Sequence, residues 1–539
     1  MIKPAHGDWR FFSLVGVLVG LVALAPYLFG QALTPTGYQF QGNTVLAPGD
    51  PNVYYSYIEQ ARQGAVLMRD VFTSEAHPAT LWQPVWLVLG WVAKITSLSA
   101  PVTYAIARII AVGMFLLVAR WAVRTMWPER PIRRAGLMLL VAGTGLSGIV
   151  VAIQGGSPDA LLQLPPDVWV SEMSTLLSSW ASPHFLLITS GYLFVLLSVE
   201  RLADQLWTRR WLLVGMVSLL TLSIHPFHII TWVTLWLSLT IWRWVVTKEF
   251  PWKYVQGWVG VVVMSAPAMV YYLTGLLVDP IVIGRALQNI NTSPSAWFVL
   301  LAMAPWLAIF AGGVIRGKSN SSRVPVWAII WAAVQLLLIF LPFSGQRRLM
   351  QAMLIPWSFM AAPIVASWWG SVQQSVIKKT ILAGALFVTF FSSAICSGWF
   401  IMRDYSLERN SRVRWEYFLS PEYQKLFLYV KTNVPADQVI LSSLWNGNLL
   451  AGFTARSVVI GHPVETLRYA EKLSAVRNFY AMTDTQKQRE SLQQYRACYI
   501  LTGPRENAYG QGFQPQTWTT LQSVWSGPTM TLWRFTDCR

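Results

Sequence analysis

The chain has 539 residues, of which 54% are apolar, 14% aromatic and only 12% charged. That charged fraction is about half of the value for an average soluble protein, and abundant Trp, Phe and Leu are the reverse of a disordered composition. The formal charge of +17 would suit nucleic acid if Lys and Arg gathered on one folded face, but they fall between apolar runs. The composition therefore excludes a soluble or disordered chain and predicts a polytopic membrane protein.

Eleven apolar runs are long enough to cross the hydrocarbon layer, which is about 30 Å thick. They lie at residues 11–30, 101–122, 135–153, 183–200, 211–224, 227–246, 255–276, 296–315, 324–342, 349–369 and 380–401. The first run exceeds the core of a signal peptide, about 7–15 residues, and lacks a clear cleavage site, so we expect it to be retained. A twelfth run, at 81–95, is short and contains Gln83, Pro84 and Lys94. It is predicted to lie in the membrane plane or to re-enter.

The positions of Lys and Arg predict the orientation, because cytoplasmic loops carry the excess of positive charge. With a cytoplasmic N-terminus, the cytoplasmic segments hold eighteen basic residues and the opposite loops before the tail hold six, namely Arg62, Arg69, Lys94, Arg285, Arg347 and Arg348. This orientation places the first loop (31–100), the second loop (154–182), a third loop (277–295) and everything after 401 on the outer side.

The tail after residue 401 reads as a soluble domain. Residues 402–539 hold 16 Lys and Arg against 11 Asp and Glu. Ser420 and Pro421 are typical of a helix start; strands are predicted at 438–441, 457–460, 498–501 and 530–535, and an amphipathic helix at 464–482. Two domains follow: a transmembrane module at 1–401 and a small extracytoplasmic α/β domain at 402–539. Cys498 and Cys538 could pair if this domain lies in an oxidising compartment.

One acid of the first outer loop, Asp50, has two interpretations. Asp50 lies in the turn Pro48-Gly49-Asp50-Pro51-Asn52, directly before an aromatic, helix-like stretch. It could form an Asx turn or cap the helix. The alternative is a general base that removes a proton from an acceptor hydroxyl or amine at the membrane surface.

The second outer loop gathers acids and a histidine. Asp159, Asp167 and Glu172 precede His184, with no basic residue between Gln154 and His184. Solvated loop acids are one interpretation. The other is a second acidic cluster that faces Asp50.

Further candidates lie at the outer ends of later runs. His225 stands in a His-Pro pair, where capping or packing is more typical than metal ligation. Arg347 and Arg348 are adjacent arginines on the outward side; they could snorkel to lipid phosphates or bind a dedicated phosphate through their guanidinium forks. In the tail, His462 lies in a loop that enters a helix.

Taken together, these features resemble the GT-C class of integral-membrane glycosyltransferases, particularly bacterial GT-C-like proteins with an outer C-terminal domain. The similar features are the acid in Gly49-Asp50-Pro51-Asn52, an in-plane segment after it, the acids from Pro166-Asp167 to Glu172, Ser182-Pro183-His184, His225-Pro226, Gln346-Arg347-Arg348, and Gly461-His462 with Glu465-Thr466. The fold class expected is a mainly α polytopic helical membrane protein with about eleven spans.

The resemblance implies transfer of a sugar from a polyprenyl-phosphate-linked donor to a lipid, glycan or protein acceptor on the outer face. It implies catalytic roles for Asp50, Glu172 and Asp167, with Asp50 as the base. It implies substrate binding by Arg347, Arg348, His184, His225 and His462, with the arginines on the donor phosphate. The second loop lacks a compact Asp-x-Asp or Glu-x-Asp, which leaves a divalent cation as an open cofactor.

The expected partners are membrane lipid, the lipid-linked donor and the acceptor, without nucleic acid, and the expected location is the plasma (inner) membrane. Two other classes stay open. One is a transporter or lipid flippase, although carriers usually place ionisable groups at mid-membrane in repeated halves. The other is a scaffold without catalysis whose outer domain binds a partner.

Overall fold

The computed structural model describes residues 6–156, 162–204, 209–315, 323–372, 375–411 and 417–538. The chain forms two compact units. Unit 1 comprises Met1–Phe29, Ala107–Tyr272 and Asn291–Asp404, and unit 2 comprises Gly30–Ile106, Leu273–Ile290 and Tyr405–Arg539. Unit 2 therefore contains the first loop (31–100) and part of the third (277–295) as well as the tail.

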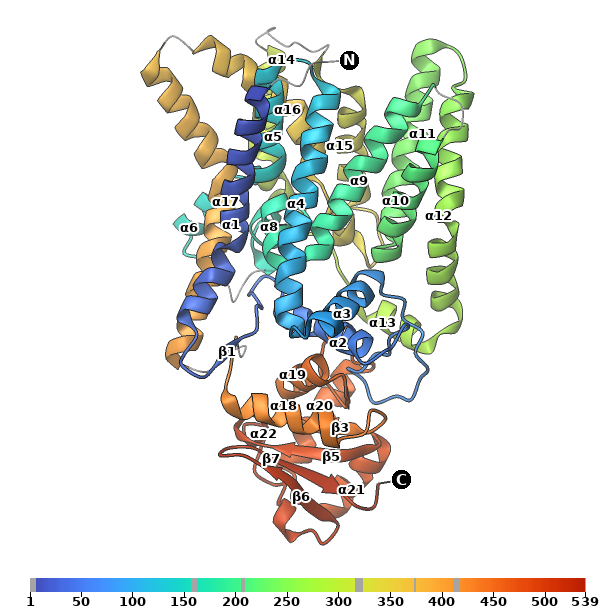
Figure 1. The fold of residues 1–539 in the computed structure, drawn as a ribbon, viewed down its shortest axis with the longest axis vertical. Coiled ribbons are helices and arrows are strands. Elements are labelled where there is room, and N and C mark those ends of the chain that lie inside the picture. The colour runs from blue at the N-terminus through green and yellow to red at the C-terminus, as the bar shows by residue number, and fades with distance from the viewer. Residues whose placement is uncertain are drawn as a thin grey trace. The chain divides into compact units, whose positions relative to one another are not determined.

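Long apolar helices build unit 1, as the sequence predicted (Figure 1). Among the described residues, eight helices are long and apolar enough to cross a membrane. They are α1 (His6–Leu33), α4 (Ala100–Met126), α9 (Pro183–Leu202), α11 (His228–Thr247), α12 (Trp252–Val278), α14 (Ala296–Ile315), α16 (Leu354–Ser371) with the 3-10 turn η3 (Gln346–Met350) before it, and α17 (Val376–Ser411). The chain is a multi-pass membrane protein.

The three other predicted runs are helical but fall short of a straight span. The run at 135–153 consists of α5 (Arg130–Ala142) and α6 (Ser147–Ile153), bent by 43°, and it would be a ninth span if the pair counts as one. Helices α10 (Arg209–Ile224) and α15 (Val326–Leu338) have 16 and 13 residues. By length and composition, eight of the described helices qualify as spans, or nine with the bent pair, beside the about eleven runs expected.

The break between α5 and α6 has a packing reason. At Gly145, a Cβ atom would lie 2.1 Å from the carboxylate oxygen Oδ2 of Asp167. A side chain at this position would collide with the second loop, so glycine permits the approach of Asp167 at the break between the two helices. Apolar length alone could not reveal this interruption.

Helix α16 lies at the centre of unit 1. The whole of its apolar window is buried, whereas only 17% of the window of α12 is. Helices α5, α14 and α15 pack against α16, and α9 packs against α10. The short helices α7 (Pro166–Trp169) and α8 (Thr175–Ala181) form the described part of the second loop. Because η3 directly precedes α16, its two arginines stand at the start of the central helix.

A mixed five-stranded sheet with surrounding helices forms the tail's part of unit 2 (Figure 1). The strands are β3 (Val439–Leu441), β4 (Ser457–Val458), β5 (Ala497–Thr502), β6 (Leu521–Ser526) and β7 (Thr531–Phe535), in the order β4-β3-β5-β7-β6. β3 is parallel to β4 and β5, and β7 is antiparallel to β5 and β6. The helices are α18 (Pro421–Asn433), α19 (Leu444–Thr454), α20 (Tyr469–Ala481), α21 (Thr485–Gln494) and α22 (Pro504–Asn507), with the 3-10 turn η4 (Pro515–Thr517). The predicted small α/β region is present.

Several details of the tail differ from the prediction. The helix expected at 464–482 begins only at Tyr469, because Arg468 before it has a φ of 52°, in the left-handed region. Strand β6 was not predicted. The helix start at Ser420 is confirmed, since its hydroxyl accepts a hydrogen bond from the Tyr423 amide.

The first outer loop supplies α2 (Asp50–Arg62) and α3 (Pro84–Thr96), and the third supplies α13 (Pro280–Gln288). With 13 residues, α3 is about 20 Å long and too short to cross the bilayer, as predicted. The loop joins the tail at several places. Among them, β1 (Gln39–Phe40) pairs antiparallel with β2 (Phe418–Leu419), and α2 packs on α19. A Cβ on Gly452 of α19 would lie 2.7 Å from that of Asn52, so only glycine permits this approach.

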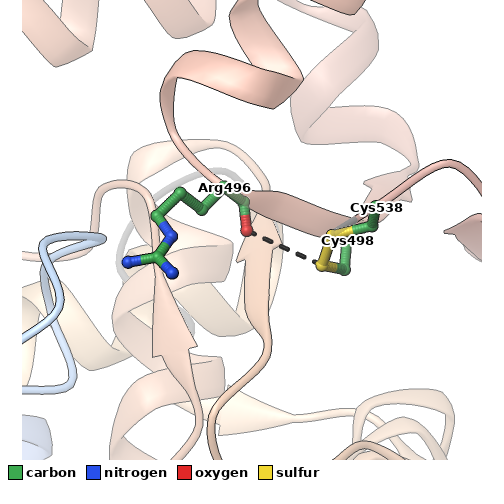
Figure 2. Close-up of a disulfide and its surroundings, with 3 residues drawn as sticks. All are labelled: Arg496, Cys498 and Cys538. Carbon is green, nitrogen blue, oxygen red and sulfur yellow. Dashed lines mark hydrogen bonds between the residues drawn. A yellow bond between two sulfur atoms is a disulfide. The ribbon is translucent and has the colours of Figure 1, made fainter.

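A disulfide joins Cys498 on β5 to Cys538, close to the chain's end (Figure 2). Their Cα atoms are 5.2 Å apart and the cysteines are 40 residues apart in sequence. The Cys498 sulfur lies 3.8 Å from the carbonyl oxygen of Arg496. The bond closes a chain segment that includes β6 and β7, and it restricts the unfolded tail.

Candidate functional site

Local backbone geometry fixes the position of Asp50. Gly49 precedes α2 with a φ of 81°, a conformation that glycine adopts without strain. The Gly49 carbonyl accepts a hydrogen bond from the Asn448 amide at 3.3 Å, and Asn448 also accepts one from Asn52 at 2.6 Å. The start of α2 is thereby tied to α19. Asp50 is the first residue of the helix, and Gly49 is its N-cap.

The Asp50 carboxylate contacts a histidine from the tail. His462 Nε2 lies 3.0 Å from Asp50 Oδ1. His462 Nδ1 accepts hydrogen bonds from the amides of Val464 (3.2 Å) and Glu465 (3.4 Å). An acceptor nitrogen carries no proton, so the ring proton is on Nε2 and is donated to Asp50. The Asp50 side chain is 49% exposed and that of His462 only 10%, so a buried histidine holds an accessible carboxylate. Burial lowers the pKa of the His462 imidazole, but the hydrogen bond to Asp50 outweighs it and the pKa is raised.

A buried ionic group lies behind this pair, within unit 2. The Arg285 guanidinium contacts Glu465, and its Nε is 3.7 Å from Asp70 Oδ2. Asp70 is 1% exposed, and burial raises its pKa to about 7 against the opposing pull of Arg285. The phenol of Tyr57 also hydrogen-bonds with Arg285. We call Asp50, His462, Glu465, Asp70, Arg285 and Tyr57 the carboxylate cluster.

This cluster contains residues that the sequence did not single out. Asp70 and Tyr57 were missed, and Arg285 had entered the charge count and, as a fallback, the search for a phosphate site. Tyr57 lies two turns along α2 from Asp50, so helical spacing could have flagged it. Asp70 follows in an irregular segment with no periodic signal, and only the fold brings it to Arg285.

A second group of side chains lies in unit 1, around η3. Arg348 Nη1 is 3.0 Å from Glu172 Oε1, with the side chains 23% and 7% exposed. The backbone reinforces this contact, since the amide of Ala352 donates to the Glu172 carbonyl at 3.0 Å. The ion pair therefore connects the second outer loop to the start of α16.

Arg347 points to a different set of neighbours. Its amide donates to the Asn291 carbonyl at 2.9 Å, and its guanidinium bonds the Asn291 side chain. The guanidinium also lies over the Trp169 ring, 5.1 Å from the centroid. The two arginines thus differ: a carboxylate neutralises Arg348, whereas Arg347 contacts the Asn291 side chain and the Trp169 ring.

Three histidines accompany Arg348. The rings of His225 and His228 stack with centroids 4.7 Å apart, and His184 Nδ1 is 2.6 Å from the Ser182 hydroxyl. Arg348, His184 and His228 are all close enough to His225 to interact with it electrostatically. We call Arg347, Arg348, Glu172, His184, His225 and His228 the arginine–histidine cluster.

Two ring nitrogens of this cluster are buried polar atoms without a partner. Among the described residues, nothing hydrogen-bonds to His225 Nδ1 or to His228 Nε2. An unsatisfied buried polar atom costs about 1–3 kcal/mol, so such atoms usually have a role or a partner outside the protein. The cluster offers these nitrogens next to a cation.

Asp167 has a different environment from Glu172. It is fully buried; its Oδ2 accepts hydrogen bonds from the Ser393 hydroxyl (2.6 Å) and the Ser147 amide (3.3 Å). Burial raises the pKa of this carboxyl group. Its contacts bind the second loop to α6 and α17. Asp159, the other acid expected here, lies outside the described residues.

In the described parts of the chain, no three His, Cys, Asp or Glu side chains are grouped so that they could hold a metal ion. Of the candidate residues from the sequence, the structure brings Asp50 together with His462, and Glu172 together with Arg348. Arg348 and His184 act electrostatically on His225.

Comparison with known proteins agrees with this architecture. A family of unknown function (DUF6541) matches residues 374–537, and no curated protein matches the chain. Among solved structures, ArnT from Cupriavidus metallidurans, bound to undecaprenyl phosphate, is similar with a TM-score of 0.53 and 12% identity, over 98% of both chains.

An archaeal enzyme is similar as well. The Archaeoglobus fulgidus oligosaccharyltransferase, tethered to an acceptor peptide, aligns with a TM-score of 0.52 and 11% identity over 91% of this chain and 69% of its own. The structure of this archaeal oligosaccharyltransferase, AglB, in complex with an inhibitory peptide and a dolichol-phosphate aligns with a TM-score of 0.51 and 11% identity. The alignment covers 95% of this chain and 72% of the AglB chain. These structures are GT-C-type polytopic membrane glycosyltransferases. The resemblance to the GT-C class is confirmed at the level of the fold.

Proposed function

We propose that this chain is a membrane glycosyltransferase that moves a sugar from a polyprenyl-phosphate-linked donor to a lipid, glycan or protein acceptor at the outer face of the membrane. The observation that carries the proposal is the half-exposed Asp50 carboxylate, held by His462, in a chain with the GT-C fold. ArnT bound to undecaprenyl phosphate and AglB with a dolichol-phosphate support a lipid phosphate as the donor's carrier.

The two clusters would carry the two halves of the reaction. Asp50 is the general base for the acceptor, because its carboxylate is accessible to an acceptor group that has to lose a proton. The arginine–histidine cluster holds the donor phosphate, where guanidinium groups stabilise the anionic leaving group without a general acid. His462 acts through Asp50 rather than on the substrate, because both of its ring nitrogens are engaged with protein groups.

A divalent cation stays a candidate cofactor. The donor's leaving group is already an anion that arginine can stabilise, so the proposed reaction proceeds without a metal step. Unchanged transfer by the purified protein in the presence of a chelator would exclude a required cation.

The function is tested by mass spectrometry of lipids and surface glycans from cells with and without the gene. We expect one acceptor to lose one sugar and the lipid-linked donor of that sugar to accumulate, because transfer is the step that consumes it. A transporter would instead leave transfer in detergent-solubilised extracts intact. Identical glycan and lipid profiles in the two strains would refute the proposal.

The same proposal places the protein in the plasma (inner) membrane with a cytoplasmic N-terminus. Single cysteines at the exposed positions Gln154, Ile95 and Leu428 should react with a membrane-impermeant thiol reagent from outside, whereas Arg124 and Arg130 variants should not. The region around Asp167 itself is unsuitable, since it is buried. Labelling of position 124 or 130 in intact cells would reverse the assigned orientation.

A further inference from the structure

The ion pair between Glu172 and Arg348 raises a question of competition. A phosphate that binds to Arg348 approaches the same guanidinium that Glu172 Oε1 contacts at 3.0 Å. Both partners are anions, and Glu172 is mostly buried, so a bound phosphate would have a carboxylate beside it. Like charges at such a distance repel strongly where water is excluded.

The neighbouring histidines mark the same place as a site for an anion. His225 is 9% exposed, its Nδ1 has no hydrogen-bond partner among the described residues, and it interacts electrostatically with Arg348. The Nε atom of Arg348 is likewise a buried donor that no described group accepts from. Two unfilled polar positions therefore remain beside the arginine while Glu172 occupies one side of its fork.

We propose that Glu172 competes with the donor phosphate for Arg348. Glu172 neutralises Arg348 in the empty site and is displaced by a polyprenyl phosphate group. The ion pair between Glu172 and Arg348 forms again when the product leaves. This inference rests on the proposed function and assigns Glu172 a role in binding and release. The geometry gives it no proton to transfer, since its described side-chain contact is an arginine.

The chemistry of the reaction supplies a reason for such a competitor. In the transfer step, the bond between the anomeric carbon and the phosphate oxygen breaks and its electron pair goes to the phosphate. The acceptor oxygen bonds to the anomeric carbon, and its proton passes to Asp50. The donor is a phosphate diester with one negative charge, whereas the product is a monoester with about 1.5 to 2 charges at neutral pH. The product would bind arginine more tightly than the donor, and Glu172 favours its release.

The test uses the purified full chain in detergent or nanodiscs, with undecaprenyl phosphate as the probe. We expect Glu172→Gln to lower the Kd at least about tenfold, mostly through slower dissociation, as is typical of changes within one interface. Glutamine keeps the size and a hydrogen-bond acceptor for Arg348 but removes the competing charge. Glu172→Met, which removes charge and acceptor together, should have the same direction and serves if the glutamine variant does not fold.

Glu129→Gln is the matched control. Glu129 is also paired with an arginine, at 3.2 Å from Arg323, in the same unit. Its neutralisation removes the same charge by the same substitution, and we expect the Kd to stay within about twofold of the wild type. A general effect of net charge would instead tighten binding in both variants and overturn the proposal.

Each remaining outcome is decisive. Inorganic phosphate as a second probe separates the head group from the lipid: tightening with both probes supports the proposal, and tightening with inorganic phosphate alone overturns it for a lipid carrier. Weaker or unchanged binding of undecaprenyl phosphate by Glu172→Gln shows that Glu172 does not compete, while the proposed function survives if the wild type binds. If neither protein binds undecaprenyl phosphate, the donor class in the proposed function falls with it.

Discussion

Asp50→Asn is expected to abolish sugar transfer by the purified protein while leaving the fold and donor binding largely intact. Asparagine keeps the size of the side chain and can still accept from His462, but it has almost no affinity for a proton. Loss of a general base typically lowers the rate by about 10²- to 10⁴-fold. The measurement is turnover with the lipid-linked donor that accumulates in cells without the gene.

A change in folding stability cannot account for a loss of turnover of this size. An acid in the first turn of a helix contributes only about 0.3–1 kcal/mol through the helix dipole, and the thermal unfolding midpoint of the variant should change accordingly little. Asp484→Asn is the matched control: Asp484 caps α21 and is 46% exposed, close to the 49% of Asp50. Near-normal turnover of Asp50→Asn, or an equal loss in Asp484→Asn, would reject Asp50 as the base.

The arginines of η3 are expected to give the second large effect. At least one of Arg347→Lys and Arg348→Lys should weaken binding of undecaprenyl phosphate by about tenfold or more, the effect of losing a charged hydrogen bond worth about 1.5–3 kcal/mol. Lysine keeps the charge but cannot reproduce the paired N–H geometry of a guanidinium. Snorkelling to bulk lipid phosphates would need only the charge, so it would tolerate lysine.

Arg323→Lys controls for the substitution itself. Arg323 is 41% exposed and pairs with Glu129, a solvated contact of the kind that contributes little, so we expect donor affinity to stay at the wild-type value. Wild-type affinity in both η3 variants would move the phosphate site elsewhere. Arg285 is then a poor substitute, because Glu465 and Asp70 already engage its guanidinium, and His225 becomes the next residue to change.

The sequence predicted the elements whose signal is local. Apolar length located the helices, and Ser420-Pro421 marked the start of α18. Helix α19 escaped, since its sequence LWNGNLLAGFT has two glycines and two asparagines, which are weak helix formers. Its stability comes from packing on α2, where Gly452 allows close approach. Tertiary contacts, which no local sequence pattern shows, make this segment helical.

The start of α20 shows the same limit at a candidate residue. The sequence continues the helix back to Val464, but the Thr466 hydroxyl accepts from the amides of Gly461 and His462 and donates to the Phe72 carbonyl. These bonds hold the segment as a loop and present His462 to Asp50. Both residues were candidates, yet they are 412 positions apart, and only the fold could reveal that they form a pair.

The pairing of the first loop with the tail has a consequence for folding of the chain during its synthesis. β1 and β2 join residues near 40 and 418, and the buried face of α2 is completed by α19. During synthesis, residues 30–106 emerge hundreds of residues before their partners, at about 5–20 residues per second. For at least about 15 seconds this segment exposes apolar surface without its complement. Residues 30–106 therefore cannot complete their packing until the tail has been synthesised. A chaperone that shields this segment until about the last 120 residues have emerged would suppress misfolding.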